Sequence, residues 1–325
     1  MAIAPKKMTL GEIRRKANAG ALSEAEIKRA FVIDENRSEA LAPQVEFNAD
    51  AVEFKGFKAK PGEAAVLLEK AGRKRRRMAA KPPGKALTAA AKAMAQTKVL
   101  AEGDSWFNLP FLIMPKTAMD FLDQTHDVLN LAMWGDELSE MVKDAQYKQS
   151  LGSGNFRHFF LSGGGNDILG SIPKYVLPRK KGDTDPANAP KYINVDFANA
   201  LNGLMKDYAK VEAAVPANTV LYVHGYAYAI PVPGGKYLGK PLKALDFDPV
   251  AHSALACAVI AYMVDLFNAR LMAFAAAKAR VVWIDLRPVV KGSDWHTDEI
   301  HPNSNGARKI ARRFREAIAA TAPVA

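Results

Sequence analysis

From residue 97 onward, short apolar segments alternate with longer helical ones, and this alternation restricts the possible folds more than any other feature. The apolar segments have the length of buried strands, and each is separated from the next by a helical stretch. Parallel strands require such crossover connections. The pattern therefore predicts an α/β fold, a three-layer α/β/α sandwich with a five-stranded parallel sheet. The predicted strands are 98–102, 126–132, 156–162, 219–224 and 280–285, and the predicted helices are 136–149, 196–214, 249–279 and 304–320.

Positive charge is concentrated in the N-terminal third of the chain. Residues 1–98 contain 21 of the 45 Lys and Arg and 11 of the 34 Asp and Glu, so the remainder, with 24 and 23, is nearly neutral. An Ala/Lys-rich helical pattern at 85–97 leads into the first predicted strand. We therefore predict a basic, mostly helical N-terminal extension over 1–96 and a second domain over 97–325.

Two helix starts are readable in the extension. Thr9 with Glu12, and Ser23 with Glu26, have the spacing of capping boxes, in which a hydroxyl at the cap and a carboxylate three residues later satisfy free backbone N–H groups. Residues 45–59 alternate loosely between apolar and polar side chains, which indicates an extended piece.

A run of five basic residues occupies 73–77. Such a run attracts nucleic-acid phosphates or other anionic surfaces, and it is also typical of a solvated helix end or linker. No zinc-finger spacing, aromatic ladder or RNA-binding sheet motif lies nearby to favour nucleic acid.

Composition excludes several classes of protein. The chain is 49% hydrophobic, which excludes wholesale disorder, and its one cysteine, Cys257, excludes an intrachain disulfide framework. The N-terminus lacks a signal-peptide pattern, and the most apolar stretch, 254–264, has about half the length that spans a bilayer. We expect no transmembrane segment and a cytoplasmic location, with non-classical export left open. The oligomeric state cannot be read from the sequence.

Polar and glycine-rich residues follow several of the predicted strands. Ser105 comes after the first strand in the sequence Gly-Asp-Ser, 130–135 leaves the second, 163–167 leaves the third, and 298–302 precedes the last helix. Ligands of open α/β sheets bind at the carboxyl edge of the strands. A serine at that edge is a nucleophile if a base takes its proton and donors stabilise an oxyanion.

These stretches, in this order, resemble the SGNH hydrolases, also known as the GDSL-type esterase and lipase family. Ser105 matches the first block of the family, Gly135 the second, Asn166 the third, and Asp298 with His301 the fifth. The resemblance covers 97–325 and implies that this region is a catalytic domain like that of the SGNH hydrolases. It departs from the family pattern at Trp106, where the GDSL tetrapeptide has leucine. The chain has no Gly-x-Ser-x-Gly elbow, which argues against the ordinary α/β-hydrolase fold.

The resemblance implies a flavodoxin-like SGNH fold and a set of site residues. Ser105 would be the nucleophile and His301 its base. Asp298, three residues earlier and expected on the same helical turn, would orient the imidazole. The oxyanion hole would consist of the backbone N–H groups of Ser105 and Gly135 and the side-chain amide of Asn166.

Other residues near these blocks are weaker candidates. His296 and Asp294 lie close together in the sequence, but without an established metal-ligand spacing, and we predict neither a metal nor a cofactor. Four residues are candidates for substrate contact because they adjoin the blocks or end a strand: Trp106, Trp134, His224 and Trp295. Two long Pro/Gly-rich connections, 170–195 and 226–248, are expected to overhang Ser105.

The function expected from these residues is carboxylic ester hydrolysis through an acyl-enzyme on Ser105. Acetylated carbohydrates, short-chain esters and lysophospholipids are all chemically possible substrates. An acyltransferase would use the same machinery with a different acceptor. A binding protein acting through its basic N-terminal region is the alternative from another class.

Overall fold

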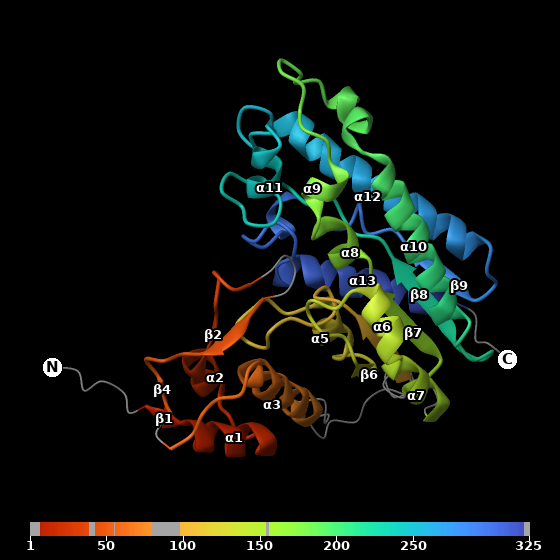
Figure 1. Cartoon of the computed structure of the whole chain (residues 1–325). Helices are drawn as coiled ribbons and strands as arrows, with labels where there is room; N and C mark the ends of the chain where they lie inside the picture. The colour runs from red at the N-terminus through yellow and green to blue at the C-terminus, as the bar shows by residue number, and fades with distance from the viewer. Residues whose placement is uncertain (1–6, 39–42, 55, 80–97, 154–155, 322–325) are drawn as a thin grey trace.

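The computed structural model describes residues 7–38, 43–54, 56–79, 98–153 and 156–321, and the side chains of 73–79 are not among the described features. The expected domain boundary at 85–97 lies outside these ranges. The chain forms a larger α/β unit with a smaller N-terminal unit beside it (Figure 1).

The larger unit is built on five parallel strands. They are β5 (Lys98–Gly103), β6 (Asp127–Asn130), β7 (His158–Ser162), β8 (Val220–His224) and β9 (Val281–Ile284), in the spatial order β6-β5-β7-β8-β9. All five predicted strands are confirmed, to within three residues at each end. In order of sequence this is 2-1-3-4-5, the doubly wound order in which ligands bind where the strand order reverses, at the carboxyl ends of the first and third strands.

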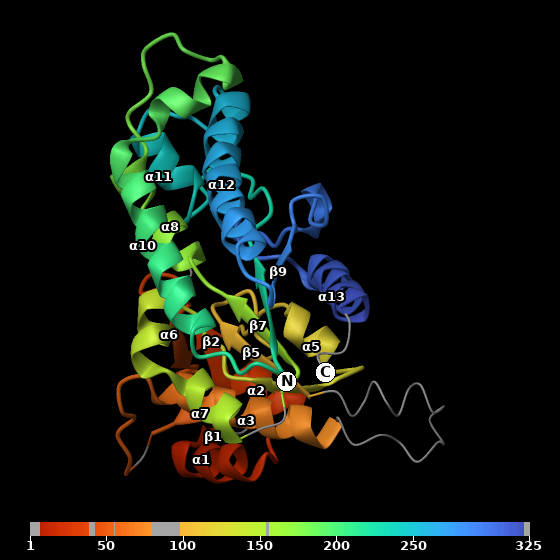
Figure 2. The same ribbon diagram turned by 90° about the vertical axis from the view of Figure 1, so that its right-hand side faces the viewer.

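Helices cover both faces of this sheet, which confirms the predicted three layers (Figure 2). Two helices, α5 (Ala118–Leu122) and α13 (Ser304–Ala320), pack together on one face. The other face carries α6 (Leu138–Asp144), α7 (Gln146–Ser153), α10 (Val195–Glu212) and α12 (Ser253–Ala276). The core between the layers is formed by the apolar side chains of the strands, such as Leu100, Phe160 and Leu221, none of which is exposed.

The two long connections are more structured than expected. The first contains α9 (Ile172–Tyr175) and the 3-10 helix η1 (Pro186–Tyr192), and the second contains α11 (Gly239–Ala244). Since η1 packs against α12, the first connection covers the part of that helix that extends beyond the sheet (Figure 1). Short helices of this kind are held by tertiary packing rather than by a periodic sequence pattern.

Helix α12 is the one described helix long and apolar enough to cross a membrane by length and composition. Half of its most apolar window is buried inside the structure, and the helix packs against β8, β9 and η1. A buried core helix of an α/β protein passes the same test of composition.

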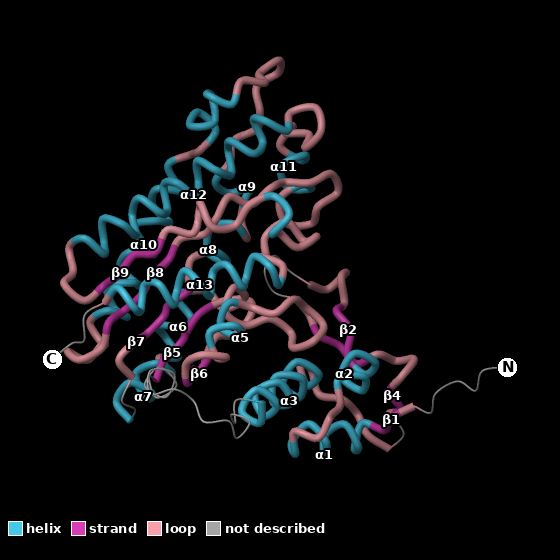
Figure 3. Tube along the Cα trace, turned by 180° about the vertical axis from the view of Figure 1, so that it is seen from behind, coloured by secondary structure: helices cyan, strands magenta, loops and turns pink. Residues whose placement is uncertain are grey.

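The N-terminal unit combines helices with short strands. It contains the helices α1 (Leu10–Ala19), α2 (Glu24–Ala30) and α3 (Glu63–Ala79) (Figure 3). Two small sheets pair β1 (Met8–Thr9) with β4 (Val52–Glu53) and β2 (Phe31–Ile33) with β3 (Val45–Phe47), and β3 and β4 fall within the predicted extended piece at 45–59. Both predicted helix starts are confirmed. Thr9 accepts a hydrogen bond from the N–H of Glu12, and Ser23 and Glu26 form the full capping box.

This unit has a hydrophobic core of its own, which continues into the larger unit. Buried Leu10, Ile13 and Leu68 belong to it, and so does Trp134, which follows β6. Residues 111–113, beyond the turn after β5, pack against the same core. The N-terminal unit therefore supports the loops that leave β5 and β6 at the carboxyl edge of the sheet.

Candidate active site

Ser105 lies in a tight turn at the carboxyl end of β5. Gly103 passes so close to β7 that a Cβ there would lie 2.6 Å from the backbone oxygen of Ser162. Asp104 is buried and its Oδ1 accepts hydrogen bonds from Trp106 N at 3.0 Å and from Ser162 Oγ at 2.8 Å. These contacts fix the turn, so Ser105 is presented at the point where the strand order reverses.

Ser105, His301 and Asp298 form a continuous hydrogen-bonded chain. His301 Nε2 lies 2.7 Å from Ser105 Oγ, and His301 Nδ1 lies 2.7 Å from Asp298 Oδ2. The serine and the histidine are each 1% exposed, so bulk water does not compete for these bonds. In this arrangement the carboxylate selects the tautomer in which Nδ1 carries the proton and Nε2 is free to accept one from the serine.

The segment holding Asp298 and His301 is a turn rather than the helical turn expected from the sequence. Asp298 Oδ1 accepts the backbone N–H of His301 at 3.1 Å, and Glu299 between them has a left-handed backbone with φ of 75°. Helix α13 begins only at Ser304, with Asn303 as its cap. The carboxylate reaches the imidazole because the chain folds back on itself, not because of helical periodicity.

A second histidine contacts the same carboxylate. His296 Nδ1 lies 3.1 Å from Asp298 Oδ2. Burial acts to raise the pKa of Asp298, but the charge of His301 and the hydrogen bonds from both histidines hold it well below its ordinary value. In turn, the hydrogen bond to Asp298 raises the pKa of His296 against the opposing effect of burial. Asp298 therefore remains ionised beneath His301.

The two predicted oxyanion-hole residues from other strands lie on adjacent turns. Gly135, after β6, has φ of 90°, and Asn166 is in α8 (Gly165–Leu169), after β7. Asn166 Nδ2 donates a 2.6 Å hydrogen bond to the backbone oxygen of Asp136. This bond uses one of the two amide N–H groups and leaves the other for a further acceptor. Burial, with added repulsion from Glu140 and other acids, raises the pKa of Asp136 to about 7.

A pocket of about 270 Å³ opens at Ser105. Its lining is mainly apolar, and none of the lining side chains is basic. The lining residues are Asp104, Ser105, Trp106, Gly165, Leu169, Tyr226, Ala227, Ala229, Trp295 and Ile300.

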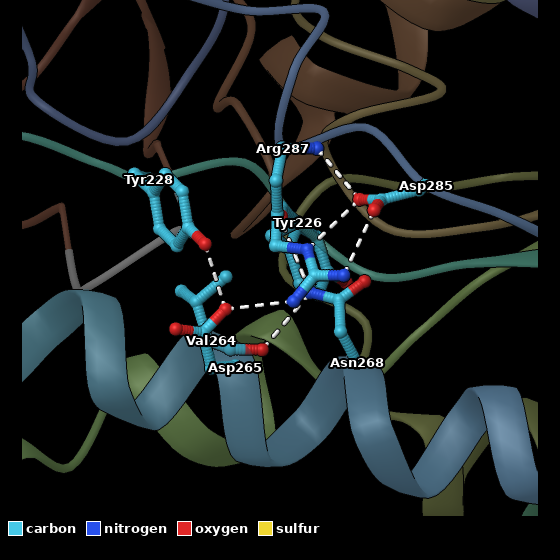
Figure 4. Close-up of polar contacts among 7 residues, drawn as sticks. All are labelled: Tyr226, Tyr228, Val264, Asp265, Asn268, Asp285 and Arg287. Carbon is cyan, nitrogen blue, oxygen red and sulfur yellow. Dashed lines mark hydrogen bonds and ion pairs between the residues drawn. The ribbon is translucent and has the colours of Figure 1, made fainter.

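One wall of the pocket is formed by Tyr226, Ala227 and Ala229. Side chains of α12 bind Tyr226 and Tyr228 in this segment (Figure 4). Asn268 Nδ2 donates to the backbone oxygen of Tyr226 at 3.2 Å, and Asp265 accepts a bond from the Tyr228 hydroxyl at 2.7 Å. The Tyr226 hydroxyl donates to Asp104 and accepts the N–H of Gly165 at 2.8 Å. This wall is thereby tied to both the turn that carries Ser105 and the turn after β7.

Arg287 completes this network by binding Oδ1 of Asp265, the same oxygen that accepts the Tyr228 hydroxyl. Arg287 Nη1 lies 2.7 Å from Asp265 Oδ1, and two further nitrogens of Arg287 bind the Asp285 carboxylate at 2.9 and 2.8 Å (Figure 4). The loop after β9 is thus joined to the same helix as the pocket wall.

The predicted substrate-contacting residues divide into two groups. Trp106 and Trp295 line the pocket. Trp134 and His224 are absent from its lining: Trp134 packs in the N-terminal core, and His224 is buried with its ring near Phe107 and its Nδ1 3.0 Å from the backbone oxygen of Gly225. Burial lowers the pKa of His224, as expected for a neutral core histidine.

Three residues of the site were not predicted in these roles from the sequence. Asp104 and Tyr226 join the Ser105 turn to the pocket wall, and Glu299 anchors the turn that carries Asp298 and His301. Asp104 belongs to the Gly-Asp-Ser sequence and could have been suspected, whereas Tyr226 follows its strand without a distinguishing pattern.

Metal-binding groups are absent from the described ranges: no cluster of three or more His, Cys, Asp or Glu side chains is placed to hold an ion. Asp294, paired in the sequence with His296, instead binds Lys309 Nζ at 2.7 Å.

No protein-family model matches the chain, and no curated protein matches it. Among solved structures, it is similar to a putative platelet activating factor from Streptococcus pneumonia, with 13% identity, a TM-score of 0.46, and coverage of 80% of this chain and 100% of the other. It is also similar to an extracellular lipase from Streptomyces rimosus, with 15% identity, a TM-score of 0.46, and coverage of 68% and 99%. A member of the lipolytic G-D-S-L family from Veillonella parvula has 17% identity, a TM-score of 0.43, and coverage of 69% and 100%.

Proposed function

We propose that this protein is a serine hydrolase of carboxylic esters. The observation that carries the proposal is the chain of two 2.7 Å contacts from Ser105 Oγ through the imidazole of His301 to Asp298, at the mouth of an apolar pocket. A serine hydroxyl is a poor nucleophile at neutral pH, and a base within hydrogen-bond reach, itself oriented by a carboxylate, removes that obstacle.

In the proposed reaction, Ser105 Oγ attacks the ester carbonyl carbon while His301 Nε2 takes the hydroxyl proton. The carbonyl oxygen becomes an oxyanion, which the N–H groups of Ser105 and Gly135 and the free amide N–H of Asn166 stabilise. Collapse of the intermediate breaks the ester C–O bond, and His301 passes its proton to the departing alcohol. Water, deprotonated by His301, then attacks the acyl-enzyme and releases the acid and the serine.

The pocket favours small, uncharged esters. Its walls include Trp106, Leu169 and Trp295, and no lining side chain carries a positive charge to pair with a phosphate or carboxylate on the substrate. We therefore propose short-chain acyl esters as the substrates, in preference to lysophospholipids. Among p-nitrophenyl esters, kcat/KM should be highest for the acetyl and butyryl esters and should fall for longer chains.

The test combines turnover with active-site labelling. Wild type should hydrolyse short p-nitrophenyl esters and react with a fluorophosphonate probe, while Ser105→Ala should lose turnover on the order of 10⁴-fold or more and take up no probe. Ser139→Ala, at an exposed serine of α6, is the matched control and should behave as wild type. A wild-type protein that neither takes the probe nor cleaves any ester would overturn the proposal. Adding an alcohol acceptor separates the alternatives, since an acyltransferase would form a new ester in place of the free acid.

A further inference from the structure

Glu299 lies between Asp298 and His301, in the turn of residues 298–301 that we call the catalytic turn. Its carboxylate is bound entirely by backbone N–H groups. Glu299 is 2% exposed, and each of its two carboxylate oxygens accepts two N–H groups from the 232–239 loop. Among the described residues, no lysine or arginine forms an ion pair with it. The donors are Val232 N at 2.7 Å and Gly239 N at 2.9 Å to Oε1, and Tyr237 N and Leu238 N, each at 3.0 Å, to Oε2. This is a backbone nest for an anion, occupied by a side chain of the same protein.

The loop is shaped around this carboxylate. A Cβ at Gly235 would lie 2.1 Å from Glu299 Cδ, and a Cβ at Gly239 would lie 2.0 Å from the backbone oxygen of Val232. Both glycines are therefore required by close approach. The loop closes on itself through the N–H of Lys240, which donates to the oxygen of Gly235 at 2.7 Å.

Glu299 also has a backbone conformation that needs support. Its φ of 75° is uncommon for a residue with a long side chain and persists where the surroundings over-determine it. The four hydrogen bonds to its carboxylate provide that constraint. Since Asp298 precedes it and His301 follows two residues later, the conformation at Glu299 determines how both side chains are presented to Ser105.

We propose that Glu299 is a positioning residue for the ester hydrolysis proposed above. Its carboxylate, held in the 232–239 nest, keeps the catalytic turn in the conformation that places His301 Nε2 against Ser105 Oγ. The same bonds fix the far end of the segment that carries the pocket-lining residues Ala227 and Ala229. The effect of Glu299 on kcat rests on the proposed ester hydrolysis, whereas its effect on the position of His301 does not.

The test uses the nest as a binding site for an added anion. Glu299→Ala leaves four backbone donors without an acceptor, and formate or acetate can take the place of the lost carboxylate. We expect kcat to fall roughly 10²-fold, the size of effect that a misplacement of about 1 Å produces. Saturable recovery should follow with formate at pH 7, and none with formamide, or with chloride at the same ionic strength.

Glu299→Gln is the matched variant. It preserves the size of the side chain but turns an –NH₂ group toward backbone donors, so it should lose activity. Because its side chain still fills the nest, formate should not restore that activity. Wild-type kcat in both folded variants, or a folded Glu299→Ala that formate does not restore, would overturn the proposal. Loss of the fold in both variants would overturn it in favour of a purely structural role.

A spectroscopic readout separates this inference from the proposed function. The Nδ1 proton of His301, bonded to Asp298, should give a low-field proton resonance in wild type that disappears in Glu299→Ala and returns with formate. This signal does not depend on ester turnover. If wild type cleaves no ester but the resonance follows formate, the proposed function fails while the positioning role of Glu299 stands.

Discussion

At the scale of single residues, the side-chain amide of Asn166 gives a direct test of the proposed mechanism. Its Nδ2 already donates to the oxygen of Asp136, and its Oδ1 is buried without a hydrogen-bond partner among the described residues. In the proposed mechanism, the bond to Asp136 holds the amide in place before substrate binds, and the second N–H of the amide donates to the substrate oxygen.

Asn166→Ala should therefore lower kcat by roughly 10²–10³-fold with a much smaller change in KM, since the donor is needed most when negative charge develops. Steady-state kinetics on the acetyl ester measure this split. Fluorophosphonate labelling should slow as well, because the reagent places an oxygen in the same position. An unchanged kcat would mean that Asn166 serves only to hold the 135–136 turn.

His296 links the triad to protein stability. Its pKa is raised, chiefly by the hydrogen bond to Asp298, and the charge of Glu35 in the N-terminal unit adds to the shift. A histidine whose pKa is raised by folding stabilises the protein below its ordinary pKa of about 6.5, and the contribution is lost as pH rises through the higher folded value. Asp298, whose pKa is lowered, stays ionised throughout this range.

His296→Gln should consequently lower Tm at pH 6 and change it little at pH 9. Thermal unfolding of both proteins across this range gives the comparison. Glu35→Gln should produce a smaller effect of the same sign. A Tm difference that is constant with pH would show that His296 contributes packing alone.

At the scale of elements, the contact between β8 and α12 sets the position of the pocket wall. A Cβ at Gly225, directly after β8, would lie 2.1 Å from Oδ1 of Asn268, and Asn268 is fully buried and bonded to the oxygens of Tyr226 and Val264 (Figure 4). There is no room for an alanine without displacing the side chain that holds the wall.

Gly225→Ala should destabilise the protein by about 1–3 kcal/mol, the usual cost of overpacking a core. The double variant with Asn268→Ala should be less destabilised than the sum of the two single variants, because the clash is removed. Urea unfolding measures all three. Gly203→Ala, in α10 with open space at its Cβ, is the control and should stabilise by roughly 0.5–1 kcal/mol. Additive effects of Gly225→Ala and Asn268→Ala would contradict the predicted steric conflict.

The elements differ in how well the sequence predicts them, for physical reasons. The strands 98–103 and 220–224 are buried on both faces, and each contains a short apolar run, 99–101 and 220–223, that stands out from its flanks. Helix α13, with its Asn303 cap and amphipathic pattern, was predicted to the residue. The catalytic turn was expected to be helical, because spacing alone cannot distinguish a helical turn from one held by Glu299 and a distant loop.

At the scale of the whole molecule, the sequence separates a basic N-terminal region from a nearly neutral remainder, but it does not reveal how the two meet. Contacts between them depend on residues far apart in the chain, such as Trp134 in the N-terminal core and Asn108 Nδ2, which lies 3.2 Å from Glu69 Oε2. Lys236 of the second long connection donates to the backbone oxygen of Glu35. No local pattern encodes such pairings, and the basic run at 73–77 gave no indication of them.

These contacts predict that the N-terminal unit is needed for activity, contrary to what an independent docking module would require. Leu68→Asp places a charge in the N-terminal core, where Leu68 has no exposed surface, and should lower both Tm and ester turnover by loosening the loops after β5 and β6. Val66→Asp, on the same helix α3 but 49% exposed, makes the same chemical change outside the core and should leave both unchanged.

A chain lacking residues 1–96 should lose turnover for the same reason, since Trp134 and 111–113 would face solvent. Full ester turnover per fluorophosphonate-labelled site in that truncated chain would show instead that the N-terminal unit is not needed for hydrolysis. The function of the unit would then have to be sought elsewhere, beginning with anion binding by the basic run at 73–77.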